Sequence, residues 1–392
     1  MVQMCRLGDI AQVITGNTPS KQVDAYWNNG HIPFITPGEL GYEVSLVSEP
    51  ESYITQKGLT KARLLPKNAV LVCCIGSLGK LGIAPTELVT NQQINALIFD
   101  ERRVYYRYGA YALTQTNPIM QKLASSTTVQ IINKSSFSNI EIPVPPITVQ
   151  RDIADILDKA QELIDKRKQQ IEMLDEFLQS VFLDMFGDPV INPFSWRTDR
   201  LGDYITFMTS GSRGWAKHYS ADGDLFLRIG NVKDGKLLLD DKQFVKAPQT
   251  REAVRAKVQE HDLLISITAD LGRTAVVDKE TALFGAYINQ HLCLVRVDQR
   301  KILPGYLSAF LESAGGRIQF ERLDQVGVKS GLNFDAIKSL EILSPPLSLQ
   351  EEYLNKVSLV KRQQLQLQKS LSEMQNLFSS IMQRAFKGEL FS

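Results

Sequence analysis

The stretch "EIPVPPITVQ" at residues 141–150 decides how this chain is organised, because "EILSPPLSLQ" at residues 341–350 nearly repeats it two hundred positions later. Residues 145–187 align with residues 345–387 without a gap. A repeat of this length indicates an internal duplication. The 392 residues also exceed the size of one ordinary domain, so the sequence predicts two or three domains with their own cores.

Each copy opens with two adjacent prolines, after which apolar residues recur at intervals of three and four. Proline is tolerated at a helix start but not in a helix interior. The apolar seam continues for more than four heptads, which is typical of a coiled coil. We expect two long helices that pair antiparallel, each roughly 58 Å long at ~1.5 Å per residue.

Arg167 and Gln364 interrupt the seam at different places in the two copies. Isolated polar residues in a seam cost stability but fix register and partner, so these two are expected to make the helices pair with each other. The alternative is that both side chains simply extend to solvent from a frayed seam. The residues predicted to pair the helices are Ile164, Arg167, Ile171, Leu174, Leu178, Gln364, Leu367, Leu371, Met374 and Phe378.

The segments before the two helices are also copies of each other. "LGDIAQVITGNTPS" from Leu7 matches "LGDYITFMTSGSRG" from Leu201, and "NQQI" from Asn91 matches "NQHL" from Asn289. Short apolar runs between Gly and Pro, as at residues 70–75 and 263–268, predict strands and turns. Helices are expected near residues 106–114 and 305–311.

These patterns predict an α+β fold with two tandem α/β domains and two long antiparallel coiled-coil helices in a pseudo-twofold arrangement. The first domain is expected at residues 1–144 and the second at residues 191–344. A central long helix is expected at residues 145–190 and a C-terminal long helix at residues 345–392. The helices then act as a spacer that holds one globular block at each end.

Composition and charge exclude several classes of protein. Apolar residues make up 43% and charged residues 22%, as in soluble globular proteins. No apolar run reaches the ~18 residues of a membrane helix, and no signal peptide pattern opens the chain, so we expect a cytoplasmic protein. Residues 141–192 carry 11 acidic against 5 basic residues, whereas both globular blocks are mildly basic. A polyanionic partner is therefore expected to contact the blocks and not the first helix.

Motifs of catalysis and metal binding are not convincing in this sequence. "GSLGKLG" at residues 76–82 resembles a phosphate loop but has the wrong spacing, so a tight turn is expected. The four cysteines, Cys5, Cys73, Cys74 and Cys293, fit neither a disulfide framework nor a zinc site and are expected to fill the core. The four histidines are scattered. We expect no catalytic residue, no metal and no cofactor in this chain.

Polar residues in the loops of both blocks are of the types that read base edges and bind phosphates in DNA. As a set, these exposed loops are expected to bind double-stranded DNA, although most single members are expected to do nothing specific. The predicted residues are Thr15, Asn17, Thr18, Ser20, Lys21, Thr36, Glu39, Lys80, Asn91, Gln92, Gln93, Thr127, Thr128, Thr209, Ser210, Ser212, Arg213, Arg228, Asn231, Arg273, Asn289, Gln290, His291, Gln325 and Lys329.

The order of these motifs resembles one known family. Tandem blocks that open with "LGD", the "TGNTPS" loop, the "IPFITPGEL" strand, the "PP...Q" helix starts, "FGDPVINP" after the first helix and a tail ending "RAFKGEL" are present. Together they resemble the specificity subunit of type I restriction-modification systems, over essentially the whole chain.

The resemblance implies two target recognition domains that each read one half of a bipartite, asymmetric DNA site. It also implies two modification subunits that use S-adenosylmethionine to methylate adenine, and restriction subunits that use ATP and Mg to translocate and cleave DNA. The methylated base is flipped into a partner's pocket, so this chain is expected to be non-catalytic.

Two other functions stay open at this point. The chain is alternatively a helix-tethered protein-interaction scaffold without DNA specificity, which steep salt dependence of DNA binding would exclude. A second alternative is an enzyme that acts on nucleotides through the loop at Gly76, in which case loss of Lys80 and Arg273 abolishes turnover.

Overall fold

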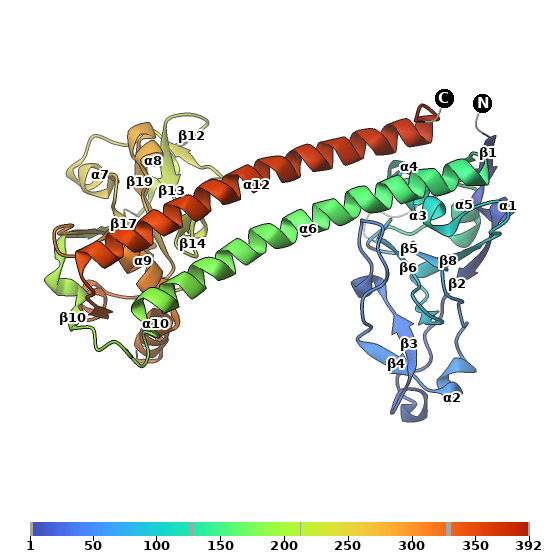
Figure 1. The fold of residues 1–392 in the computed structure, drawn as a ribbon, viewed down its shortest axis with the longest axis horizontal. Helices are drawn as coiled ribbons and strands as arrows, with labels where there is room; N and C mark the ends of the chain where they lie inside the picture. Colours follow the sequence, from blue (N-terminus) through green and yellow to red (C-terminus); the bar gives the residue numbers. More distant parts are fainter. Residues whose placement is uncertain (1–2, 125–128, 212, 327–330, 391–392) are drawn as a thin grey trace. The chain divides into compact units, whose positions relative to one another are not determined.

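The computed structural model describes residues 3–124, 129–211, 213–326 and 331–390. The chain divides into two compact units (Figure 1). Unit 1 consists of residues 1–168 and 370–392, and unit 2 consists of residues 169–369. This division passes through both long helices, so each unit contains a globular region together with part of each helix.

Unit 1 begins with a two-stranded pairing and builds two further sheets. Its strands are β1 (Gln3–Arg6), β2 (Ala11–Thr15), β3 (Ile32–Ile35), β4 (Ser52–Ile54), β5 (Val70–Cys73), β6 (Leu81–Ile83), β7 (Val89–Thr90), β8 (Ile94–Phe99) and β9 (Glu141–Val144). Its short helices are α1 (Leu7–Ile10), η1 (Asp24–Tyr26), η2 (Pro37–Glu39), α2 (Gln56–Leu59), α3 (Tyr106–Thr114), α4 (Asn117–Leu123) and α5 (Lys134–Ser138).

Unit 2 uses a related set of elements. Its strands are β10 (Thr198–Arg200), β11 (Ile205–Ser210), β12 (Tyr219–Ser220), β13 (Asp224–Leu227), β14 (Val232–Lys233), β15 (Lys236–Leu237), β16 (Phe244–Val245), β17 (Leu263–Ser266), β18 (Thr274–Val276), β19 (Ala286–Ile288), β20 (Leu292–Val297) and β21 (Glu341–Leu343). Its short helices are η3 (Leu201–Asp203), η4 (Trp215–His218), η5 (Ile229–Asn231), α7 (Arg251–Ala256), α8 (Lys279–Phe284), α9 (Pro304–Glu312), α10 (Ala314–Val326) and α11 (Phe334–Lys338).

The two units share one sheet topology, as the duplicated sequence predicts. Unit 1 has a four-stranded sheet in the order β2-β8-β5-β6, and unit 2 has β11-β20-β17-β18 in the same positions. In both sheets every neighbouring pair is antiparallel. The second sheets also correspond, because β3 pairs parallel with β7 and β13 pairs parallel with β19.

The core of unit 1 occupies both faces of its four-stranded sheet. Neighbouring residues Cys73 and Cys74 belong to different apolar clusters, because successive side chains of a strand point to opposite faces. Cys5 and Cys293 are buried as well, so the prediction that the cysteines fill the core is confirmed. Burial raises the pKa of Cys74 and of Cys293 to about 12, which keeps both thiols protonated and unreactive.

The two long helices are α6 (Ile147–Phe186) and α12 (Leu347–Lys387). Figure 1 shows α6 in green and α12 in red beside each other. Their antiparallel pairing is visible within each unit. In unit 1 the start of α6 shares a core with the end of α12 through Leu157 and Met382. In unit 2 the end of α6 packs on the start of α12, with the rings of Phe182 and Tyr353 at 5.6 Å.

The repeated "PP...Q" motif at the start of each long helix ends in a buried glutamine. Gln150 and Gln350 are both 0% exposed. The amide of Gln150 accepts a hydrogen bond from Tyr105 N at 2.8 Å and donates to Pro145 O and Arg103 O, each at 2.8 Å. In the same way Gln350 accepts from Leu303 N at 2.9 Å and donates to Pro345 O at 2.8 Å.

These glutamines explain why the sequence repeats "PP...Q". Each side chain joins the first turn of a long helix to the segment that leads into α3 or α9. A buried amide keeps its full set of partners because an unpaired polar group in the core costs free energy. The motif therefore fixes the globular region to its helix.

Two buried tyrosines make a second equivalent contact. Tyr108 Oη donates to Pro143 O at 2.8 Å, and Tyr306 Oη donates to Leu343 O at 2.9 Å. We expect Tyr108→Phe and Tyr306→Phe each to lower the free energy of unfolding by about 1 to 2 kcal/mol, because a buried carbonyl loses its donor. Chemical denaturation measures this loss. Tyr42→Phe, which removes a hydroxyl from a residue that is 57% exposed, is the control and should change little.

No helix within the described part of the chain is both long enough and apolar enough to span a membrane.

Candidate nucleic-acid interface

In unit 1, loops that follow three different strands meet at one edge. Thr18, after β2, donates through Oγ1 to Gln92 Oε1 at 2.7 Å, and Gln92 follows β7. The adjacent Gln93 accepts from Asn91 Nδ2 at 2.9 Å and donates to Ile75 O, after β5, at 3.4 Å. These contacts gather the loops at residues 15–18, 75–80 and 91–93, which the sequence had assigned to DNA binding.

A glycine allows the first of these loops to approach the next strand in both units. A Cβ at Gly16 would overlap the side chain and carbonyl of Thr90, and a Cβ at Gly211 would overlap the carbonyls of Ile288 and Asn289. Only glycine has no Cβ and permits so close an approach of two backbones. This close approach of two backbones explains why "TGNTPS" and "SGSRG" both have a glycine at this position.

Four predicted DNA-binding residues are buried, which corrects the expectation that all of them lie exposed. Asn91 is 8% exposed, Thr209 8%, Asn231 5% and Asn289 9%. Asn91 Oδ1 accepts from Gln93 N at 3.0 Å, and its counterpart Asn289 accepts from His291 N at 3.1 Å. Asparagine commonly closes a turn by accepting from the backbone two residues further on. These asparagines shape the loops.

Several predicted basic residues already have acidic or carbonyl partners. Arg273 lies 2.9 Å from Asp270, 3.0 Å from Asp234 and 3.6 Å from Glu312. Arg228 lies 2.7 Å from Asp241. Lys80 Nζ donates to Pro37 O at 3.4 Å. A guanidinium that is neutralised by three carboxylates attracts a phosphate less strongly than a free one.

The remaining predicted residues differ in accessibility. Ser20, Lys21, Gln92 and Arg213 are exposed. Those that are half-buried are Thr15, Asn17, Thr18, Thr36, Glu39, Lys80, Gln93, Ser210, Arg228, Arg273, Gln290 and His291. Thr127, Thr128, Ser212 and Lys329 lie outside the described residues, and Gln325 lies in α10 with its side chain outside the described part.

In unit 2 the corresponding edge centres on His291. Its Nδ1 lies 2.7 Å from Thr268 Oγ1, and its Nε2 lies 3.1 Å from Gln290 Nε2. Thr268 follows β17, so this contact joins the loop after β17 to the loop after β19. The sequence predicted His291 and Gln290 for this site but missed Thr268.

Two basic residues of unit 1 were also missed. Arg63 Nη1 donates to Thr15 O at 2.5 Å, and the carbonyl of Lys61 accepts from Asn17 Nδ2. Both side chains are exposed and lie beside the loop at residues 15–18. The signal in the sequence was "KAR" at residues 61–63, a basic pair between two predicted strands. Such a pair beside polar loops is typical of a phosphate-binding surface.

All ten residues predicted to pair α6 with α12 are buried or half-buried. Those predicted to pair the helices include Ile164, which is 3% exposed, and half-buried Ile171, Leu174, Leu178, Leu367, Leu371, Met374 and Phe378. Arg167 is half-buried. Gln364 donates to Asp175 Oδ1 at 2.9 Å, a contact between the two helices within unit 2.

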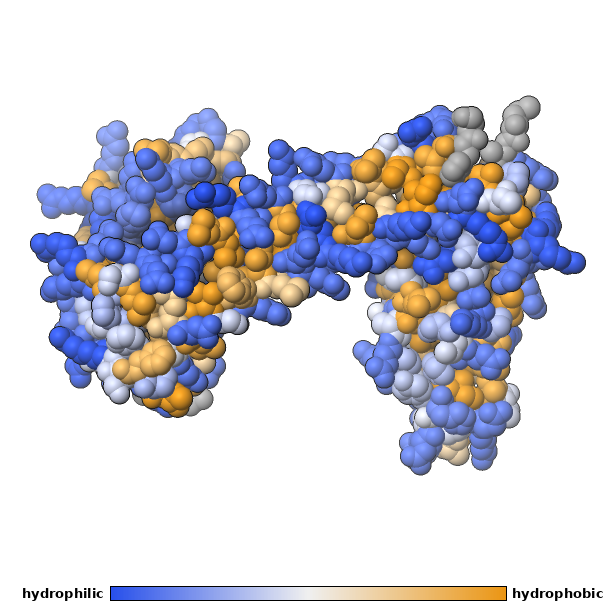
Figure 2. Space-filling view, in the orientation of Figure 1, coloured by the Kyte–Doolittle hydropathy of each residue, from blue (hydrophilic) through white to orange (hydrophobic). Residues whose placement is uncertain are grey.

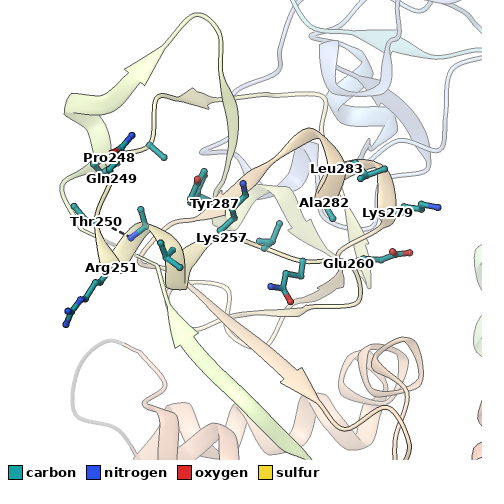
Figure 3. Close-up of a pocket in the computed structure, with 15 residues that line it drawn as sticks. Pro248, Gln249, Thr250, Arg251, Lys257, Glu260, Lys279, Ala282, Leu283 and Tyr287 are labelled. Atoms are coloured by element: carbon teal, nitrogen blue, oxygen red, sulfur yellow. Dashed lines mark hydrogen bonds between the residues drawn. The ribbon is translucent and has the colours of Figure 1, made fainter.

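A cavity of about 890 Å³ lies elsewhere in unit 2, between α7 and α8 (Figure 3). Figure 3 shows Lys257 and Tyr287 at its centre, with Arg251 on one side and Leu283 on the other. Its lining contains none of the predicted DNA-binding residues.

The loop at Gly76 is a tight turn, with φ of 80° at Gly76 and 79° at Gly79, as the sequence predicts.

Metal ligands do not gather in the described residues: no group of three or more His, Cys, Asp or Glu side chains there could hold an ion. The polar edges of the two units carry amides, hydroxyls and basic groups, and Arg228 and Arg273 among the basic groups are paired with carboxylates. Such groups bind and orient a ligand through hydrogen bonds.

The chain is similar in sequence to proteins of known families. Residues 1–173 match the family model described as type I restriction modification DNA specificity domain. The type I restriction enzyme MjaIX specificity subunit of Methanocaldococcus jannaschii is 27% identical over 61% of this chain and 60% of its own length. The StySPI specificity subunit of Salmonella potsdam is 23% identical over 69% of this chain and 62% of its own length.

The matched part thus spans about three fifths of each of these two relatives. In addition, the crystal structure of a type I restriction-modification S subunit from M. genitalium has the same fold, with a TM-score of 0.59 at 16% identity. It covers 98% of this chain and 96% of that chain. Residues 1–173 thus match the DNA specificity domain of type I restriction-modification systems, and the chain with its duplicated units and paired long helices is similar in sequence and in fold to the specificity subunits of those systems.

Proposed function

We propose that this chain is the DNA-reading subunit of a type I restriction-modification complex. Each globular region recognises one half of a bipartite, asymmetric site, and the paired helices form the spacer between the halves. The observation that carries the proposal is the same cluster of polar loops at the same sheet edge of both units. Because the two clusters differ in sequence, the two half-sites differ as well.

In this proposal the chain contributes no catalytic residue. Two modification subunits supply S-adenosylmethionine and methylate adenine, and restriction subunits supply ATP and Mg for translocation and cleavage. We place the complex in the cytoplasm because its DNA substrate is there. The boundaries at residues 1–144, 145–190, 191–344 and 345–392 describe the two recognition domains and the two helices of this proposal.

Exposed apolar side chains on the helices support docking of partner subunits. Phe177 of α6 is 52% exposed, and Leu377, two hundred residues later on α12, is 61% exposed. Figure 2 shows apolar side chains in orange along the helices. Apolar groups that remain on the surface of a folded chain commonly mark protein contacts.

Sequencing of methylated adenines in the source genome, with and without this gene, tests the proposal. We expect a bipartite methylated motif that disappears on deletion. Replacing residues 1–144 by the corresponding residues of another specificity subunit should change one half of the motif and leave the other intact. A motif that survives deletion, or that changes in both halves, contradicts the proposal.

Charge reversal in the exposed loops should weaken DNA binding. We expect Lys21→Glu and Arg213→Glu each to lower affinity about tenfold and to reduce the dependence of affinity on salt, because a cationic contact with phosphate is lost. Fluorescence anisotropy with duplex DNA over a series of salt concentrations measures both. Lys67→Glu, an exposed lysine outside the predicted loops, is the matched control. Binding that does not weaken with salt favours the protein scaffold instead.

A further inference from the structure

In unit 1, a loop of the globular region contacts α6 through the carboxylate of Glu43. Glu43 lies in the loop between η2 and β4. Its Oε2 accepts from Gln161 Nε2 at 3.2 Å, and its Oε1 lies 3.3 Å from Lys168 Nζ. Gln161 and Lys168 are seven residues apart, two turns of the helix. Both oxygens of Glu43 are thus held by the same face of α6.

In unit 2, a hairpin contacts the helices through the ammonium group of Lys236. Lys236, in β15, places Nζ 2.7 Å from Asp175 Oδ1 of α6. The same oxygen accepts from Gln364 Nε2 of α12 at 2.9 Å. Partial burial opposes ionisation of Asp175, but the hydrogen bonds from Lys236 and Gln364 prevail and lower its pKa. Asp175 is therefore charged at neutral pH.

The two contacts come from equivalent places in the duplicated fold. The sequence offset between the globular regions is 194 at Leu7 and Leu201 and 193 at Asn68 and His261, so Glu43 corresponds to residue 236 or 237. The backbone neighbours of the two loops support this correspondence. The loop of Glu43 runs beside β6, where Gly41 bridges Leu81, and the hairpin of Lys236 runs beside β18. The strands β6 and β18 hold the same position in their sheets.

The loop of Glu43 is not held to the helices by close packing alone. A cavity of about 320 Å³ lies beside the contact, lined by Tyr42 and Val44 of the loop, Tyr111 of α3 and Phe378 of α12, among others. Space of this size forfeits dispersion contacts between the loop and the helices. The loop is therefore held both by Val44, which is buried in the core of unit 1, and by the polar contact of Glu43.

We propose that Glu43 and Lys236 are positioning residues that tie their own globular region to the helix pair, Glu43 through Gln161 and Lys168 and Lys236 through Asp175. The two contacts use opposite charges at equivalent places. Glu43 is an anion beside Lys168, and Lys236 is a cation beside Asp175, with the like charge of Lys361 of α12 nearby.

This inference rests on the proposed function in one respect only, namely the purpose of orienting each globular region, which is to present its recognition loops to DNA. The contacts themselves are testable without DNA. Each loop contains amides whose hydrogen exchange reports on it, since Val47 N donates to Ile83 O at 3.0 Å and Leu238 N donates to Asn231 O at 2.8 Å.

The first experiment reverses the charge in unit 1 of the full chain. We expect Glu43→Lys to speed hydrogen exchange in residues 40–48 about two- to fivefold, the effect of losing a partly exposed ion pair. The double variant Glu43→Lys with Lys168→Glu should restore the exchange rate of the parent. Glu49→Lys makes the same charge change in the same loop, at an exposed residue, and should leave the rate unchanged.

The second experiment repeats this design in unit 2. We expect Lys236→Glu to speed exchange in residues 232–238 by a similar factor, and Lys236→Glu with Asp175→Lys to restore it. Lys233→Glu, at an exposed lysine of the same hairpin, is the control. Restoration by a swapped pair distinguishes a specific charge contact from a general disturbance of the loop.

The inference is overturned if the single reversals leave exchange unchanged, if the swapped pairs fail to restore it, or if the controls speed it equally. Its failure is distinct from failure of the proposed function. Loss of the methylated motif on gene deletion tests the proposed function in the unmodified chain. Exchange rates of the isolated chain do not depend on that result.

Discussion

Replacing Gln150 by leucine should lower the free energy of unfolding by about 3 kcal/mol, because the variant leaves Tyr105 N–H and two carbonyls without their partner. Each buried polar group left unpaired costs about 1 to 3 kcal/mol. Gln350→Leu should have a comparable effect in unit 2, since Gln350 is also 0% exposed. For units of this size 1 kcal/mol shifts the melting temperature by about 2 to 4 °C. Scanning calorimetry measures the shift.

The control for both variants is Gln170→Leu, which makes the same substitution at an exposed position of α6. It should leave the melting temperature nearly unchanged. The two amides are not what fixes the globular regions to the helices if Gln150→Leu lowers the melting temperature no more than Gln170→Leu does.

Asp262→Leu is expected to cost about 3 to 5 kcal/mol, because it leaves a partly buried guanidinium without its counter-charge. The side chain of Asp262 is 1% exposed, and its two oxygens accept from Arg296 Nε at 2.7 Å and Nη2 at 3.0 Å. Asp262 Oδ2 also accepts from Gln259 N at 2.6 Å, a bond that leucine cannot make. Chemical denaturation of unit 2 measures the loss.

The double variant Asp262→Leu with Arg296→Met should recover most of this loss. Burial raises the pKa of Asp262 despite the hydrogen bonds from Arg296. An acid whose pKa is raised on folding costs the folded state free energy as pH rises through that pKa, so at neutral pH the ionised carboxylate is not a net stabiliser. The loss in the single variant therefore comes mainly from the guanidinium of Arg296 that is left without its counter-charge. A double variant as unstable as the single one would contradict this account.

The long helices could be predicted closely from the sequence. Prolines 145 and 146 mark the start of α6 at Ile147, and the three-four spacing of apolar residues carries it to Phe186, four residues before the predicted end at residue 190. The helix at residues 106–114 was predicted with the bounds that α3 has. These signals are local, because proline geometry and hydrophobic periodicity act within a few residues of the chain.

The candidate interface could be predicted as a set of loops but not residue by residue. Asn91 and Asn289 have the same residue type as a base reader, yet each is buried and closes its own turn. Arg273 has the charge that a phosphate contact needs, yet it faces three carboxylates. A polar residue type states what a side chain can bind, and only its neighbours decide what it does bind.

The sequence by itself determined the duplication, the two helices and the strands that repeat in both halves, because these depend on periodicity and on the conformational limits of proline and glycine. Only the tertiary structure decided which polar side chains form hydrogen bonds and ion pairs within the fold. Gln150 meets a backbone amide 45 residues away, and Glu43 meets Lys168, 125 residues away. Contacts between such distant segments form only when the chain packs, so no local pattern records them.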